Sequence, residues 1–103
     1  MVHGSPSGND TIILGTVTVL DDTQIQTGAG NDTVQISSST FGQSGGYSRG
    51  GDLEVDLGAG NDSLSISNST VVGDFQADGG QGVNTFTSTN NTFDGRVEIR
   101  NFS

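Results

Sequence analysis

Cysteine, tryptophan and lysine are absent from this 103-residue chain, and proline occurs once. The absence of cysteine excludes disulfides, zinc-thiolate sites and thiol catalysis. Three arginines oppose 12 acidic residues, so the formal net charge is −9. Such a chain cannot neutralise nucleic-acid phosphates or anionic lipid headgroups, and no apolar run is long enough to span a bilayer. We therefore expect no nucleic-acid partner and no membrane insertion, but an attraction for metal cations or basic partners.

Apolar residues are also scarce, at 29%, whereas glycine supplies 17 residues. A conventional globule of this size needs more apolar material to offset chain entropy, and this composition alone is typical of disorder. A solenoid escapes the shortage, because it buries only a thin axial core and stacks each coil on the next. The length predicts one domain, residues 1–103.

A repeat runs through the chain and is the main sign of order. The segment Gly-Ala-Gly-Asn-Asp occurs at residues 28–32 and again at 58–62, with weaker copies around Gly8 and Gly82. The aligned glycines at 8, 30, 60 and 82 are separated by 22, 30 and 22 residues. The middle interval is longer by 8, which we assign to a loop inserted at about residues 43–51.

With this insertion removed, apolar residues align in columns and alternate with polar ones. The columns are Ile12, Val34, Leu64, Phe86; Val19, Phe41, Val71, Phe93; Thr23, Leu53, Phe75, Val97; Ile25, Val55, Ala77, Ile99; and Leu14, Ile36, Ile66, which ends at Ser88. Alternation with a period of two indicates strands that face inward on one side. The fold class expected is all-β, a right-handed parallel β-helix of about four coils of roughly 22 residues. An antiparallel sandwich is the alternative, but it does not require equal residues at equal offsets.

The turn motif Gly-x-Gly-Asn-Asp-x-apolar, at residues 28–34 and 58–64, resembles the nonapeptide of the haemolysin-type (RTX) calcium-binding repeats. Each coil carries this motif at one turn, whereas a coil of that family carries it on both sides. The resemblance implies a calcium-binding β-solenoid. The metal ligands that it implies are Asp10, Asp32, Asp62 and the neutral Asn84, with the turn glycines Gly28, Gly30, Gly58 and Gly60.

The acidic residues of these turns lead to the same expectation by electrostatics. Asp32 and Asp62 share strand parity with inward-facing residues, so their carboxylates should point into the turn and stack in a file about 4.8 Å apart. Neighbouring carboxylates at that spacing repel by roughly 3–4 kcal/mol at an effective dielectric of about 20. A calcium ion between coils would remove the repulsion. The alternative is that these side chains only hydrogen-bond turn amides, as a ladder without metal.

Other polar groups are assigned less specific roles. A second acidic file, Asp22, Asp52 and Asp74 ending in Arg96, is expected to be a solvated edge. We expect exposed ion pairs of small energetic value between Arg96 and Asp74, and between Arg100 and Asp78. The single histidine, His3, is expected to lie in an unstructured terminus.

Two further patterns give alternative functions. Clustered carboxylates would be enough in number for a glycosidase pair, but they fall in regular outward columns: Asp52, Glu54, Asp56, Asp74 and Asp78. A threonine column, with a polar column two residues before it, resembles the flat faces of β-helical ice-binding proteins: Thr18, Thr40, Thr70 and Thr92, preceded by Thr16, Ser38, Asn68 and Asn90. Threonine is also a good strand residue in its own right.

The sequence therefore predicts no enzyme and no catalytic residues. We expect a non-catalytic, calcium-stabilised structural or binding module of a secreted or cell-surface protein of bacterial type. An ice-binding protein that uses the threonine column, and a carbohydrate-active β-helix fragment, are the alternatives. The partners expected are calcium ions, a carbohydrate or surface partner, and a second copy of the chain through end-to-end self-association, because solenoid ends carry unpaired strand edges.

Overall fold

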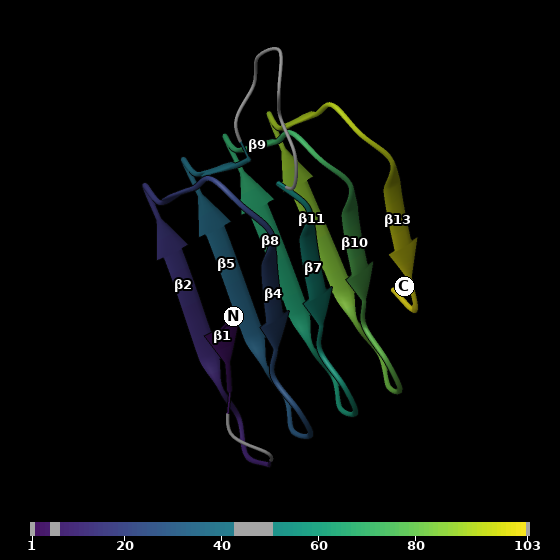
Figure 1. Cartoon of the computed structure of the whole chain (residues 1–103). Coiled ribbons are helices and arrows are strands. Elements are labelled where there is room, and N and C mark those ends of the chain that lie inside the picture. The colour runs from purple at the N-terminus through teal and green to yellow at the C-terminus, as the bar shows by residue number, and fades with distance from the viewer. Residues whose placement is uncertain (1, 5–6, 43–50, 103) are drawn as a thin grey trace.

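The computed structural model describes residues 2–4, 7–42 and 51–102, which form three parallel sheets and contain no helix (Figure 1). Sheet A contains β1 (Val2–His3), β4 (Thr23–Gln26), β7 (Leu53–Asp56), β10 (Phe75–Asp78) and β13 (Val97–Arg100). Sheet B contains β2 (Thr11–Gly15), β5 (Thr33–Ser37), β8 (Ser63–Ser67) and β11 (Thr85–Thr89). Sheet C contains β3 (Thr18–Val19), β6 (Thr40–Phe41), β9 (Thr70–Val71) and β12 (Thr92–Phe93). The chain visits the sheets in the order A, B, C, and this confirms the parallel β-helix.

The register of the strands is the one that the sequence columns predict. Val34 pairs with Ile12 on one side and with Leu64 on the other, and the pairing continues to Phe86. In sheet A, Ile25 pairs with Val55 in the same way. A slip of one residue would turn every inward side chain out to solvent, so the apolar alternation fixes the register.

The core is a thin column of side chains along the axis of the stack. Its fully enclosed members come from the middle coils: Ile25, Val34, Ile36, Phe41, Leu53, Val55, Leu57, Leu64, Ile66, Val71, Phe75 and Ala77. The equivalent residues of the first and last coils are half-buried or exposed. Aromatic rings fill the C-terminal end of this column, where Phe75 stacks on Phe93 with ring centroids 5.1 Å apart. A narrow core shared by every coil needs few apolar residues, as the composition requires.

Three corners connect the sheets, and two of them need backbone conformations that few residues adopt. The first corner, from sheet A to sheet B, holds the glycine motif, in which Gly30 and Gly60 have φ of 124° and 129°. A Cβ on Gly60 would overlap the carbonyl oxygen of Gly30, so only glycine fits. The second corner, from B to C, turns on one left-handed residue per coil, with φ between 50° and 53°: Thr16, Ser38, Asn68 and Asn90.

The third corner leads from sheet C back to sheet A. In one coil it contains the insertion predicted at about residues 43–51, and the structure shows where this insertion begins and ends. Gly42 and Gly51 are both buried, and a Cβ on Gly51 would lie 2.5 Å from the Cα of Gly42. The chain thus leaves the coil and returns to it at one point. Without residues 43–50, this corner would have three residues, as it has at 20–22, 72–74 and 94–96. The insertion predicted at about 43–51 therefore lies between these glycines, and most of it falls outside the described residues.

The expectation of an unstructured N-terminus around His3 is wrong. Val2 and His3 form β1, which pairs with Ile25 and Gln26 of β4. The amide of Gly4 extends this pairing with a hydrogen bond to the carbonyl of Gln26, at 2.7 Å. In the described part of the chain, no helix is long and apolar enough to cross a membrane.

Excision of residues 43–50, which joins Gly42 to Gly51, should leave the fold intact because the two glycines already lie in contact. We expect a cooperative melt with an unfolding free energy unchanged or raised by up to about 1 kcal/mol, since a shorter loop costs less closure entropy. Circular dichroism would measure it. Deletion of residues 72–74, which contain no excess chain, is the control and should abolish the cooperative melt. Loss of cooperative melting in the first variant would contradict this placement of the insertion.

Candidate functional site

The four polar side chains predicted as metal ligands lie in one file at the first corner, beside the turn that contains Gly28, Gly30, Gly58 and Gly60. Asp10, Asp32, Asp62 and Asn84 each directly precede a strand of sheet B, and those strands pair in register. Asp32 and Asp62 are only 1% and 3% exposed, and Asn84 is fully buried. The carboxylates thus point into the turn, as their strand parity predicts.

Three side chains of this file, those of Asp32, Asp62 and Asn84, each accept a hydrogen bond from the coil before them. The amide of Asp10 donates to Oδ1 of Asp32, the amide of Asp32 donates to Oδ1 of Asp62, and the amide of Asp62 donates to Oδ1 of Asn84, each at 2.8 Å. The three bonds join coils and not residues of the same turn. These bonds form a ladder of side-chain acceptors. Such a ladder is the alternative to a metal site that the sequence left open.

The second oxygen of two of these carboxylates has no partner. Oδ2 of Asp32 and Oδ2 of Asp62 are both buried and make no hydrogen bond. Burial raises the pKa of Asp62, and the charge of Asp32 raises it further, although the hydrogen bond from the Asp32 amide opposes the shift. A buried carboxylate oxygen without a partner is costly, so this pair of side chains is electrostatically unfavourable in the folded chain.

The last member of the file shows how a neutral side chain fits the same place. Asn84 accepts from the Asp62 amide through Oδ1 and donates through Nδ2 to the carbonyls of Gly79 at 2.8 Å and Asn101 at 3.0 Å. An amide thus satisfies both ends of the side chain where a carboxylate leaves one oxygen unpaired.

The fit of the file to a calcium ion is partial. The unpaired Oδ2 atoms of Asp32 and Asp62 belong to adjacent coils, and hard carboxylate oxygens are ligands that calcium prefers. Within residues 2–4, 7–42 and 51–102, however, no group of three or more His, Cys, Asp or Glu side chains is placed to hold a metal. Calcium takes six to eight oxygen ligands, so backbone carbonyls and water would have to supply most of the coordination sphere.

Ladders of the same kind occur elsewhere on the first corner and on the second corner. On the outer side of the first corner, the amide of Asn31 donates to Oδ1 of Asn9, and the amide of Asn61 donates to Oδ1 of Asn31, each at 2.8 Å. The second-corner ladder was missed by sequence reasoning. There the amide of Ser39 donates to Oγ of Ser69 at 3.1 Å, and Ser69 donates to Asn91 at 2.9 Å. Its signal is the recurrence of Ser or Asn at one column position.

The acidic file on the third corner is more than the solvated edge that the sequence predicts. Asp22, Asp52 and Asp74 are exposed, but Oδ1 of each accepts the amide of the next residue in the file, at 3.1, 2.7 and 2.9 Å, and the file ends at the amide of Arg96. Arg96 thus contacts Asp74 through its backbone and not through the ion pair that we expected.

The ion pair expected between Arg100 and Asp78 is not formed as a direct contact, although the charge of Arg100 acts on Asp78. The guanidinium of Arg100 pairs with Glu98, two residues earlier on its own strand. Asp78 accepts hydrogen bonds from the side chain of Asn101 at 2.7 Å and from the amide of Gly80 at 2.8 Å. These two bonds lower the pKa of Asp78, and the positive charge of Arg100 lowers it further.

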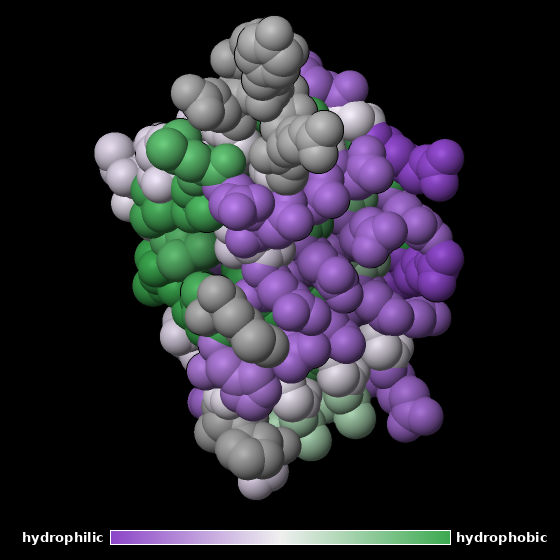
Figure 2. All heavy atoms as spheres, in the orientation of Figure 1, coloured by the Kyte–Doolittle hydropathy of each residue, from purple (hydrophilic) through white to green (hydrophobic). Residues whose placement is uncertain are grey.

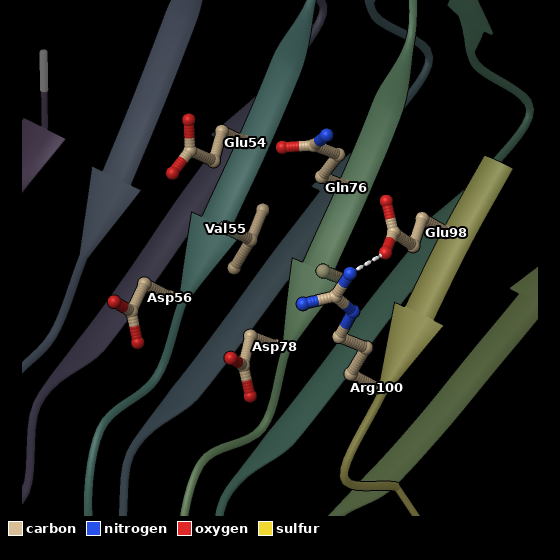
Figure 3. Close-up of a pocket in the computed structure, with 8 residues that line it drawn as sticks. Glu54, Val55, Asp56, Gln76, Asp78, Glu98 and Arg100 are labelled. Atoms are coloured by element: carbon tan, nitrogen blue, oxygen red, sulfur yellow. Dashed lines mark hydrogen bonds and ion pairs between the residues drawn. The ribbon is translucent and has the colours of Figure 1, made fainter. Parts of the chain in front are cut away.

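The outer face of sheet A carries most of the exposed charge. Figure 2 shows strongly hydrophilic residues across the middle of the face in view, where β4, β7, β10 and β13 lie. A shallow depression of 170 Å³ lies there, and Figure 3 shows Glu54, Asp56 and Asp78 projecting from two strands beside the Glu98–Arg100 pair. These three carboxylates stand in separate outward positions, as the sequence predicts, and no hydrogen bond joins one of the three to another.

The threonine column is present, but the flat two-column array is not. Thr18, Thr40, Thr70 and Thr92 pair in register on sheet C. The residues two positions earlier lie at the left-handed second corner, not on a strand. The strands of sheet C are only two residues long. The structure therefore offers a single file of threonines, whereas an ice-binding face needs a flat array of at least two columns.

No family model, curated protein or solved structure matches this chain. The likeness to haemolysin-type repeats therefore rests on the motif at residues 28–34 and 58–64 and on the stacking of coils that the structure shows.

Replacement of Asp62 by asparagine tests the electrostatics of the file without calcium. Because the pKa of Asp62 is raised in the folded chain, its ionised form costs stability above that pKa, and the cost disappears as the pH falls through it. We expect Asp62→Asn to raise the unfolding free energy at pH 7, and the gain to shrink toward pH 4. Denaturant melts in chelator at several pH values would measure the difference from the parent chain.

Asp78→Asn is the matched control and should behave in the opposite sense. Its lowered pKa means that the carboxylate stabilises the fold at pH 7 and that this contribution is lost as the pH falls through the folded-state pKa. The variant should therefore be less stable than the parent at pH 7 and approach it in acid. Equal effects of both substitutions at every pH would contradict the electrostatic account.

Proposed function

We propose that this chain is a non-catalytic β-solenoid module of a secreted or cell-surface protein, and that calcium bound at the first corner strengthens its stack. The observation that carries the proposal is the buried file in which Asp32 and Asp62, on adjacent coils, each keep one carboxylate oxygen without a partner. The structural role and the calcium are separable parts of the proposal.

The structural role is supported by where the corner hydrogen bonds go. At all three corners, amides donate to side-chain oxygens of the adjacent coil, and the strands of each sheet pair along their length. Apart from residues 43–50, which are not described, the connections between strands are short. Catalytic sites are usually built from loops on a rigid scaffold, and corners of this length leave little chain for that purpose.

Calcium is supported by charge and by the resemblance to the haemolysin-type repeat. A cation between Asp32 and Asp62 would cancel their repulsion and give both Oδ2 atoms a ligand. The site would offer calcium only two carboxylate charges, those of Asp32 and Asp62. Calcium sites with few charged ligands have Kd values of about 10⁻⁴–10⁻³ M, the range of extracellular modules. A site of this affinity fits a secreted or surface location and would stay empty at cytosolic calcium levels.

A calcium titration followed by thermal melting tests this proposal. At a calcium concentration of about ten times the Kd, one site stabilises the folded chain by about 1.4 kcal/mol. For a domain of this length, that corresponds to a rise in Tm of about 6–11 °C relative to chelator. Asp32→Asn and Asp62→Asn should each remove the rise, because an amide keeps the ladder but lacks the charge.

Asp52→Asn makes the same change in the exposed third-corner ladder and should keep the calcium response. Magnesium at equal concentration is the second control, because it loses its hydration water reluctantly and demands octahedral geometry. If the Tm of the parent chain is the same in calcium and in chelator, calcium does not stabilise the module. If Asp52→Asn abolishes the response as well, the site is not the buried file.

A further inference from the structure

The first strand of the chain makes sheet A longer than the other two sheets. Sheet A has five strands, whereas sheets B and C have four each, and the extra strand is β1. Its two residues cover only Ile25 and Gln26 of β4, whereas the next strand, β7, pairs with all four residues of β4. The half of β4 that contains Thr23 and Gln24 has no neighbour on this side among the described strands.

The opposite end of sheet A presents a complete strand edge. The carbonyls of Arg96 and Arg100 accept the amides of Phe75 and Gly79, so the backbone groups between them, on Val97 and Ile99, face away from β10. The side chains of Val97 and Ile99 are 46% and 36% exposed, although their columns are buried in the middle coils. An open edge of this kind is a template for another strand.

The two ends of the solenoid are complementary in register and in charge. The four residues of β13 occupy the same columns as the four residues of β4, so β13 of one copy would continue sheet A beneath β4 of another. Arg96 and Asp22 occupy the same column, so the same stacking would bring Arg96 of one copy opposite Asp22 of the other. The N-terminal end is also apolar, because Ile12, Leu14 and Val19 of the first coil are only partly buried. Figure 2 shows a hydrophobic patch on the side of the molecule where β2 lies.

Each end also carries a group that obstructs this contact. β1 occupies the edge of β4 that β13 of a second copy would need. At the other end, the ring of Phe102 packs on Phe86 with centroids 5.6 Å apart, over the column where Ile12 of the second copy would lie. Both groups would have to move before the coils could meet.

We propose that copies of this chain associate head to tail, β13 of one against β4 of the next, and that β1 and Phe102 act as stops that keep this association weak. The opposite choice, N-terminal end against N-terminal end, would run β4 antiparallel to β4 and would lack the pairing of Asp22 with Arg96. Head-to-tail stacking along the axis of the solenoid does not close into a ring, so it gives open-ended oligomers and not a fixed dimer. The inference depends on the ends alone and is independent of the proposed calcium site.

Sedimentation velocity over a concentration series tests the role of the stops. A chain that lacks residues 1–4, and the Phe102→Ser variant, should each associate more strongly than the parent, and a chain with both changes most strongly. We expect the association constant of the double variant to rise at least about tenfold, the change that roughly 1.4 kcal/mol produces. Species larger than a dimer should appear as the concentration rises. A double variant that sediments as the parent does would overturn the proposal.

Two further variants separate this contact from nonspecific aggregation. Ile99→Pro removes an amide that faces the free edge and leaves the pairing with β10, since proline is tolerated at an edge in that orientation. Added to the double variant, it should restore monomers. Asp22→Asn should weaken association, because it removes the charge opposite Arg96, whereas Glu54→Gln removes one charge from the middle of sheet A and should not. Persistent oligomers with Ile99→Pro, or equal effects of the two charge changes, would refute the head-to-tail contact.

Discussion

The structure depends on one interaction, the hydrogen bond from a backbone amide at a corner to the side-chain oxygen of the equivalent residue on an adjacent coil. Within the sheets, strand pairing satisfies the backbone. At the corners some amides still reach a backbone carbonyl of the adjacent coil, but others need a side-chain acceptor. The Asp32 amide finds one in Asp62 at 2.8 Å, and the Ser39 amide finds one in Ser69 at 3.1 Å. A buried amide without an acceptor costs about 1–3 kcal/mol. Short polar side chains at a fixed offset therefore hold the coils in register.

The same interaction creates the electrostatic problem at the first corner. Aspartate offers an acceptor to the neighbouring coil through Oδ1, but its Oδ2 is then buried, and at Asp32 and Asp62 it has no partner. Asparagine avoids the problem, and Asn84 shows that it fits. Two charged residues stand where a neutral one would complete the ladder, and this is the physical reason for proposing a cation at this place.

Periodicity allowed the sheets, the register and the core to be predicted, because each apolar column repeats at a fixed offset. The sequence could not decide between ladder and metal at Asp32 and Asp62, since both uses need the same inward carboxylate. It also missed β1, because Val2 and His3 precede the first complete repeat, and it misassigned Arg100, because a long side chain on a strand reaches several acceptors and Glu98 is the nearer one. The polar column at Thr16 resembles a strand face in the sequence because the alternation continues through a two-residue corner.

Engineered disulfides test most directly whether equivalent residues of successive coils lie over one another. The chain has no cysteine, so Gln35→Cys with Ser65→Cys introduces one unambiguous pair on facing positions of β5 and β8. Their Cα atoms should lie about 4.8 Å apart, inside the range of about 4.4–6.8 Å that a disulfide spans. We predict that this pair oxidises in the folded chain and that Gln35→Cys with Thr87→Cys, two coils apart, does not. Oxidation of the second pair in place of the first would contradict the stack.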